Sequence, residues 1–221
     1  EKTRHQAGPI RVTPAAHHTM GGLLTDTRGR TALDGLYAIG EVVGGIHGAN
    51  RVGGNALCEA LVYAERAVGS LLAETAPPDP GSSFESLVHH ALQAESAGPR
   101  SRSADSLDPG TMLQLLRKSM WEGAGIIRSR ESLERTCQTI ETLQQKSRTD
   151  VPGTPRERVR LQEIRQALLA AKAIALSALQ RTESRGAHFR KDWPREDPNW
   201  QRHIVLAMSG DEVLVAGYRE V

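Results

Sequence analysis

The sequence predicts an α+β, mostly helical protein: a glycine-rich first part with a short strand and a helix, followed by a small helical bundle domain with a terminal β-hairpin. Three observations lead to this prediction. Residues 1–74 are rich in glycine and short apolar segments, residues 75–110 are polar and rich in helix breakers, and residues 111–221 carry long helical stripes. We therefore expect two domains joined by a linker at 75–110.

Composition and charge argue against several classes of function. The 221 residues carry 28 basic and 26 acidic side chains, a net charge of +2 without a long basic stripe, which argues against nucleic acid as a partner. No apolar run approaches the about 20 residues of a membrane span, so direct membrane insertion is not expected. Cys58 and Cys137 have no C-x-x-C neighbours, which argues against a disulfide framework or a metal site and favours the reducing cytoplasm.

The sequence of residues 1–74 predicts one strand and one helix. Gly35 to Glu41, "GLYAIGE", is an apolar run bounded by glycine and is interpreted as a short buried strand. Residues 55–74 are predicted to form a helix, with Asn55 as its N-cap. Its apolar positions recur at steps of three and four, which predicts a buried face made of Leu57, Leu61, Ala64, Val68 and Leu72.

The linker contains one weak helical piece, "FESLVHHALQAE", with His89 and His90 inside it. Neighbouring residues of a helix point in different directions, so these two histidines are interpreted as solvated rather than as metal ligands.

The last part is helical until its final strands. Two stripes precede residue 141: Leu113, Leu116, Met120, Ala124 and Ile127, then Leu133, Cys137 and Ile140. "TPRE" then predicts a capping box of Thr154 and Glu157. The helix that it opens runs to about Thr182, with a buried face of Leu161, Ile164, Leu168, Ala171, Ala175 and Leu179. Two apolar runs around Ser209-Gly210-Asp211 predict the hairpin.

Candidate chemistry begins in "GEVVGGIHGANRVGGNAL", where a strand end, a glycine-rich turn and a helix start follow one another. Such a segment can cradle an anionic or electron-rich group, because glycines admit close approach and the helix start offers free N–H groups. Glu41 is placed to accept hydrogen bonds from ribose or ribitol hydroxyls. Arg51 could hold a carboxylate with two donors, or equally pair with a nearby aspartate.

A second polar cluster lies in "PAAHHTMGG". His17 could donate to a carboxylate, with Thr19 as donor or acceptor beside it. The alternative is a pair of turn histidines satisfied by backbone carbonyls, and spacing alone does not decide between the two.

Four motifs carry a resemblance: "PAAHHTMGG", "GLYAIGEV", "GGIHGANRVGGNAL" and "RTESRGAHFRKDWP". In this order they closely resemble the flavoprotein subunit of succinate dehydrogenases and fumarate reductases, a superfamily that includes L-aspartate oxidase. The resemblance extends from about Pro9 to Trp200. It implies FAD as cofactor and a C4 dicarboxylate as substrate, held between an FAD-binding domain, whose C-terminal part would be residues 1–74, and a capping domain.

The resemblance also implies roles for single residues. His17, Thr19 and Arg51 would bind the substrate. Glu41 would contact the flavin, and the helix start at Asn55, Ala56 and Leu57 would receive its pyrimidine end, where negative charge develops. His18 is set aside, because the family often has tyrosine there.

Other parts of the family pattern are not found here. The chain has no G-x-G-x-x-G, so the FAD pyrophosphate site is expected upstream, together with the histidine that can link to FAD and the proton-shuttle arginine. The chain is thus expected to be the C-terminal portion of a flavoprotein, with no catalytic residue of its own, and to be inactive alone. The resemblance further implies a partner that carries iron–sulfur clusters, and a cytoplasmic place, membrane-associated through partner subunits.

The motifs "HHTMGG" and "RVGGNAL" are more similar to those of fumarate reductases than to those of aspartate oxidases. This favours the fumarate/succinate reaction over the oxidation of L-aspartate to iminoaspartate. A non-catalytic assembly module that docks a partner protein is a third hypothesis for the isolated chain. "RTESRGAHFRKDWP" is either a contact surface or a local arrangement in which Glu183 and Arg185 pair and Gly186 ends the helix. The local arrangement is favoured.

Overall fold

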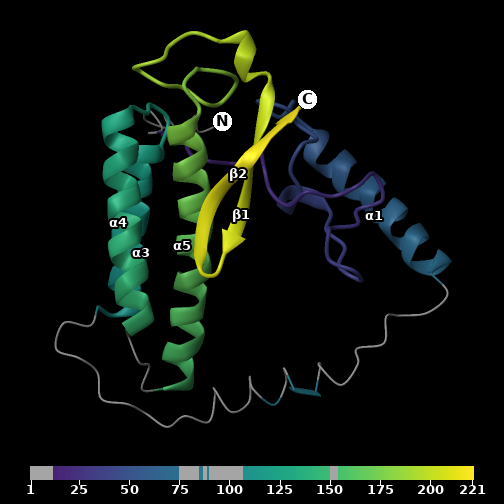
Figure 1. The fold of residues 1–221 in the computed structure, drawn as a ribbon, viewed down its shortest axis with the longest axis horizontal. Coiled ribbons are helices and arrows are strands. Elements are labelled where there is room, and N and C mark those ends of the chain that lie inside the picture. Colours follow the sequence, from purple (N-terminus) through teal and green to yellow (C-terminus); the bar gives the residue numbers. More distant parts are fainter. Residues whose placement is uncertain (1–11, 75–84, 87–88, 90–106, 150–153) are drawn as a thin grey trace, which may run out of the picture. The chain divides into compact units, whose positions relative to one another are not determined.

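A computed structural model describes residues 12–74, 85–86, 89, 107–149 and 154–221 of the chain (Figure 1). The chain divides into two compact units, Glu1–Pro78 and Asp79–Val221, which are described separately below. Most of the linker predicted at 75–110, including His90 and most of the helical piece around it, lies outside the described residues. None of the helices in the described ranges has the length and hydropathy needed to cross a membrane.

The first unit is built from one long helix, α1 (Asn55–Ala73), and irregular segments that include a 3₁₀ turn, η1 (Gly40–Val42). The strand predicted at residues 35–41 is wrong. Tyr37 forms a single antiparallel bridge with Arg30, and the chain continues from there into η1. A strand requires a continuous ladder of partners, and left-handed glycines at both ends of this segment, Gly35 (φ 75°) and Gly40 (φ 73°), bend the backbone instead.

Helix α1 was predicted correctly, but its buried face was not. The predicted apolar stripe is largely exposed, with Leu57 77%, Leu61 73% and Leu72 82% accessible. The residues buried in this helix are Glu59, Ala67 and Ser70. Periodicity locates the apolar face of a helix but does not say which face the rest of the unit covers. The N-cap is Gly54 (φ 85°), which makes Asn55 the first helical residue rather than the cap.

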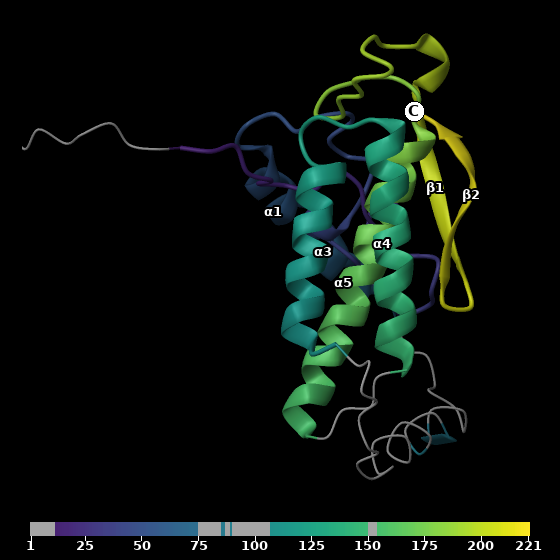
Figure 2. The same ribbon diagram turned by 90° about the vertical axis from the view of Figure 1, so that its left-hand side faces the viewer.

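The second unit is a bundle of α3 (Pro109–Ala124), α4 (Arg130–Thr149) and α5 (Pro155–Gln180), which lie side by side in both views (Figures 1 and 2). The predicted stripes of α4 and α5 are confirmed. The main core consists of Met112, Leu116, Cys137, Ile140, Leu143, Ile164, Leu168, Ala171 and Ala175. Leu113 and Met120 pack against it as partly buried residues, whereas Ile127 is 63% exposed, beyond the end of α3.

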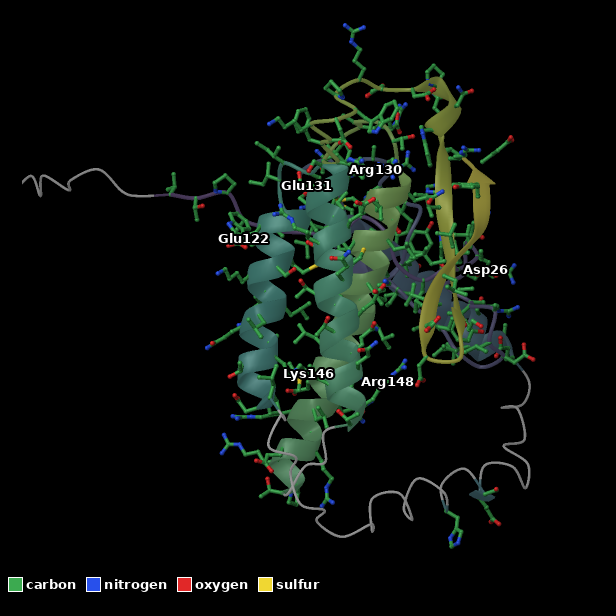
Figure 3. The ribbon with its side chains drawn as sticks, turned by 60° about the vertical axis from the view of Figure 1, so that its left-hand side comes forward. Asp26, Glu122, Arg130, Glu131, Lys146 and Arg148 are labelled. Atoms are coloured by element: carbon green, nitrogen blue, oxygen red, sulfur yellow. The ribbon has the colours of Figure 1, made fainter. Side chains whose placement is uncertain are left out.

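The helix starts follow their sequence signals. The capping box is present: Thr154 Oγ1 accepts from the Glu157 N–H (3.2 Å), and the Glu157 carboxylate accepts from the Thr154 N–H (3.0 Å). In α4, Glu131 lies in the first turn, and Lys146 and Arg148 lie in the last (Figure 3). This distribution of charge complements the helix dipole.

Gly123 sets the distance between α3 and α4. A Cβ atom at this position would lie 2.0 Å from Thr136 Oγ1 and 2.6 Å from the carbonyl oxygen of Ser132. Any side chain larger than hydrogen would therefore push the two helices apart.

The predicted hairpin is confirmed. Strands β1 (Arg202–Ser209) and β2 (Glu212–Glu220) are antiparallel, with Ser209 paired to Glu212 beside the turn and Arg202 to Glu220 at the open end. A register shift between Val205 and Leu206 marks a bulge. Figures 1 and 2 show the hairpin alongside α5.

The segment between α5 and the hairpin is held by buried charges. Glu183, fully buried, accepts from Arg181 Nη1 (2.6 Å) and from Arg185 Nε (2.9 Å), which confirms the predicted pairing of Glu183 with Arg185. Hydrogen bonds from both arginines hold the pKa of this carboxyl below its usual range, against the opposing effect of burial. The prediction that Gly186 ends the helix is wrong: α5 ends at Gln180, and Gly186 (φ 57°) lies in the turn between Arg185 and His188.

Candidate functional site

Two chain segments come together in the first unit. Leu23 donates its N–H to the Val42 carbonyl (2.8 Å), and Gly44 donates to the Leu23 carbonyl (3.0 Å). A Cβ atom on Gly22 would lie 2.0 Å from the Val42 oxygen, so only glycine allows this approach. The pairing places "HHTMGG" beside "GEVVGG", as the sequence-based site requires.

Glu41 joins the two segments. Its Oε1 accepts from the Thr19 N–H (2.9 Å), and its Oε2 lies 3.5 Å from His18 Nδ1. The carboxylate is still 54% exposed. Glu41 and Thr19 are therefore brought together, through the backbone of Thr19, and part of the carboxylate stays available to hydroxyl donors.

The two histidines of "HHTMGG" are placed differently. His17 is exposed, and no hydrogen bond within the described residues joins it to Arg51. The side chain of His18 is only 7% exposed and packs edge-on against the ring of His47, with centroids 5.2 Å apart. Within the described ranges, its Nε2 atom is buried and has no hydrogen-bond partner. Setting His18 aside on sequence grounds thus overlooked the more buried residue of the two.

Sequence reasoning also missed a buried hydrogen-bonded pair. His47 Nε2 lies 2.6 Å from Glu59 Oε2, and the two side chains are 8% and 3% exposed. The pair connects the glycine-rich turn to the second turn of α1. One signal could have indicated it: a glutamate opposite an apolar helical stripe, twelve residues after a histidine among glycines.

Arg51 is partly buried near the end of the glycine-rich turn. Its Nη1 donates only to the neighbouring Val52 carbonyl (3.4 Å), and its Nε is buried without a partner among the residues described. In the same ranges no aspartate pairs with it, which removes support for the alternative interpretation. A partly buried guanidinium with unused donors can bind an anionic group.

The start of α1 has unused donors as well. Gly54 caps the helix without a side-chain hydrogen bond, and the Asn55 N–H donates to the Val52 carbonyl (3.2 Å). The open N–H groups of the first turn are therefore those of Ala56 and Leu57, which carry the partial positive charge of the helix end. Cβ atoms added to Gly45, Gly48, Gly53 or Gly54 would meet nothing within 4 Å. The open backbone at this helix start can therefore receive an electron-rich planar group. No three His, Cys, Asp or Glu side chains gather for a metal ion in the described part of the chain.

Two family models match the chain. One, described as FAD binding domain, matches residues 2–57, and the other, described as fumarate reductase flavoprotein C-term, matches residues 114–221. The first range includes every candidate residue of the site, from His17 to Leu57. This match confirms the prediction of FAD as the cofactor.

Curated relatives carry two different activities in their names. The chain is 40% identical, over 203 residues, to a fumarate reductase (CoM/CoB) subunit of Methanothermobacter marburgensis, covering 90% of this chain and 36% of the relative. It is 36% identical to L-aspartate oxidase of Streptomyces coelicolor, covering 93% and 35%, and 40% identical to that of Rhodospirillum rubrum, covering 91% and 64%. The chain thus spans about a third of the length of the first two relatives.

Solved structures share the fold. An E. coli quinol fumarate reductase flavoprotein matches with a TM-score of 0.82 at 30% identity, covering 97% of this chain and 38% of that one. Mycobacterium smegmatis Sdh1, in complex with UQ1, matches with a TM-score of 0.79 at 31% identity, covering 93% and 36%.

Proposed function

The chain belongs to the flavoprotein family of succinate dehydrogenases and fumarate reductases, and we propose that it forms part of an FAD-dependent oxidoreductase interconverting fumarate and succinate. The observation that carries the proposal is the convergence of His18, Thr19 and Glu41 from two distant segments. Arg51, with its unused buried donor, and the start of α1, where the cap makes no side-chain hydrogen bond, lie in the same matched range.

The residues present fit a flavin. The open glycine backbone leaves room for a flat ring, and the N–H groups of Ala56 and Leu57 would donate to its pyrimidine end and stabilise negative charge there, next to Asn55, whose own N–H is already used by the Val52 carbonyl. Glu41 would hold hydroxyl groups with the exposed part of its carboxylate. When bound, FAD supplies the hydride chemistry.

The chain's own residues would bind and orient the dicarboxylate. Arg51 would hold one carboxylate through its guanidinium donors, and the exposed His17 would donate to the same or a neighbouring oxygen. Thr19 would contribute its hydroxyl, because its backbone N–H is already used by Glu41. Fixing a carboxylate at these groups orients the adjacent carbon toward its reaction partner.

The domain roles and partners follow from the same proposal. Residues 1–74 would complete the FAD-binding domain and residues 111–221 would form the helical C-terminal domain, joined by the linker at 75–110. The proposed partner is an iron–sulfur subunit, in a cytoplasmic enzyme that reaches the membrane through its partner subunits. The Methanothermobacter relative is named as one subunit of its enzyme, which supports a multi-subunit assembly.

L-aspartate oxidation is the second candidate, because two relatives with that name are 36% and 40% identical. The purified full-length protein separates the two: fumarate reduction with a reduced viologen dye supports the first, and iminoaspartate formation from L-aspartate supports the second. If the full-length protein contains no flavin, both proposals fail. The isolated 221-residue chain is expected to bind FAD weakly and to leave fumarate unchanged, consistent with an assembly role for the fragment alone.

Substitution of Arg51 tests the proposed dicarboxylate site more directly than a comparison of activities. In the full-length protein, Arg51→Gln is expected to lower kcat/KM for the dicarboxylate roughly 100-fold, as the loss of charged hydrogen bonds worth about 3 kcal/mol implies. Arg66→Ala is the matched control, since Arg66 lies exposed on α1 against the Tyr63 ring. Equal kinetics for Arg51→Gln and the unmodified protein would refute the role of Arg51.

A further inference from the structure

A continuous chain of side-chain contacts links every segment of the candidate site. It begins at Glu59 on α1 and passes to His47 in the glycine-rich turn (2.6 Å). It continues across the ring contact of His47 with His18 (5.2 Å between centroids) and from His18 to Glu41 (3.5 Å). Glu41 finally holds the Thr19 N–H (2.9 Å).

We propose that His47 and Glu59 are positioning residues of the site, which hold the turn bearing Arg51 and the segment bearing His17 and Thr19 in register with the start of α1. The proposal rests on the proposed function and deepens it. Neither residue is assigned to bind substrate or cofactor, and both act through the groups that do.

The burial of Glu59 makes its contact with His47 important for the site. The Glu59 side chain is 3% exposed, and a carboxylate withdrawn from water is stable only when it is paired. His47 Nε2 contacts one carboxylate oxygen of Glu59, Oε2. The other oxygen, Oε1, is buried without a partner in the described ranges. The carboxylate therefore depends on this one contact, and the turn that carries His47 is fixed to α1 as long as the contact persists.

The glycine-rich turn needs such an anchor. Gly45 and Gly48, on either side of His47, both have positive φ (96° and 57°) and open space where a Cβ would be. A backbone of this kind has many accessible conformations, so the ordering of Arg51, four residues after His47, depends on contacts elsewhere in the turn. The guanidinium of Arg51 itself makes only one long hydrogen bond within the described ranges, to its neighbour Val52 (3.4 Å).

The ring of His18 extends the effect to the other segment. The ring of His18 makes the edge-on contact with His47, and its Nδ1 atom lies 3.5 Å from the carboxylate of Glu41. His18 lies between His17 and Thr19 in sequence, so a shift of its ring displaces both candidate substrate groups at once.

The test uses the full-length protein with Glu59→Ala and His47→Ala, and with Glu65→Gln as the matched control, because Glu65 is an exposed glutamate of the same helix. For both alanine variants we expect the KM for fumarate to rise about tenfold while kcat changes less than about threefold, because displaced binding groups weaken the capture of the substrate. Bound FAD per chain is expected to stay unchanged. Glu59→Gln keeps the shape of the side chain and is expected to recover most of the KM.

A second readout is independent of turnover. Trypsin cleavage after Arg51 reports how firmly the turn is held, and we expect it to be at least about fivefold faster in both alanine variants and unchanged in Glu65→Gln, because a cleavable loop must open locally. Where one alanine variant does not fold, the other carries the test, with the same increases in KM and in cleavage expected.

The outcomes separate the two proposals. Without fumarate turnover in the unmodified protein the proposed function fails, and the positioning role is then decided by trypsin cleavage alone. KM and cleavage rates within about twofold of the unmodified protein in the alanine variants would overturn the positioning role. An equal loss of kcat, FAD and cooperative unfolding in Glu59→Gln would also overturn it, since it would mean a general structural role.

Discussion

Replacement of Arg190 by methionine is expected to destabilise the second unit strongly. Arg190 is fully buried and donates to the carbonyl oxygens of Ala178 (2.9 Å), Leu179 (3.2 Å) and Arg181 (3.0 Å) at the C-terminal end of α5. It also holds Asp192 with two hydrogen bonds, of 2.8 and 2.6 Å, and these keep the pKa of that carboxyl below its usual range. One side chain therefore satisfies the last carbonyls of a helix and neutralises a carboxylate.

The magnitude follows from these contacts. Breaking a buried ion pair by removing one partner costs about 3–5 kcal/mol, and each carbonyl left without a donor costs about 1 kcal/mol more where water does not reach it. Asp192 is 30% exposed and can be hydrated after the loss, so we expect about 3–5 kcal/mol in total. With a urea m-value of about 2 kcal/mol per molar, the midpoint of unfolding would fall by roughly 2 M.

Tryptophan fluorescence is the appropriate assay. All three tryptophans, Trp121, Trp193 and Trp200, lie in the second unit, so a urea titration of the 221-residue chain followed by their emission reports on that unit. Arg135→Ala is the control: this arginine is 71% exposed, in an i,i+4 pair with Glu131, and its loss should cost at most about 0.5 kcal/mol. A loss below about 1 kcal/mol for Arg190→Met would refute the reasoning.

Three further changes have expected outcomes. Gly123→Ala should destabilise the bundle by about 1–3 kcal/mol in thermal unfolding, because its Cβ would overlap Thr136 and Ser132, whereas Gly69→Ala, where the methyl meets open space, should be neutral or stabilising. Thr154→Ala should cost about 1 kcal/mol through loss of the capping box, with the exposed Thr142→Ala as comparison. His188 has a pKa lowered from 6.5 to about 4, chiefly by burial and then by Arg128. The unfolded chain therefore takes up a proton near pH 6.5 and the folded chain only near pH 4, so stability is retained above pH 6.5 and lost as the pH falls through this window. After allowance for partial solvent exposure the loss is about 1–2 kcal/mol, and His188→Gln should abolish that pH dependence in unfolding titrations; an unchanged dependence would contradict the assignment.

The second unit could be predicted from the sequence because its signals are local. The stripes of α4 and α5 face one another within a single bundle, so the apolar face identified by periodicity is also the buried face. The Thr154–Glu157 box and the turn at Gly210 depend on residues that are neighbours in sequence. Arg190 could not be predicted in the same way, since its partners at the end of α5 are 9 to 12 residues away and its burial depends on how the chain folds back over the helix.

The first unit shows why its site was predicted only in part. Periodicity gave α1 an apolar face, yet the structure buries the opposite face, with Glu59 at 6% and Leu61 at 73% accessible. The carboxylate of Glu59 is tolerated in this buried position because His47 Nε2 lies 2.6 Å from it. The spacing of apolar residues along the helix does not predict this contact. Departures from local sequence rules concentrate at functional sites, where other contacts offset them. The burial of the Glu59 face of α1 and the His47–Glu59 pair are thus one feature: the face that carries Glu59, Ala67 and Ser70 is covered, and Glu59 joins it to the glycine-rich turn that bears Arg51.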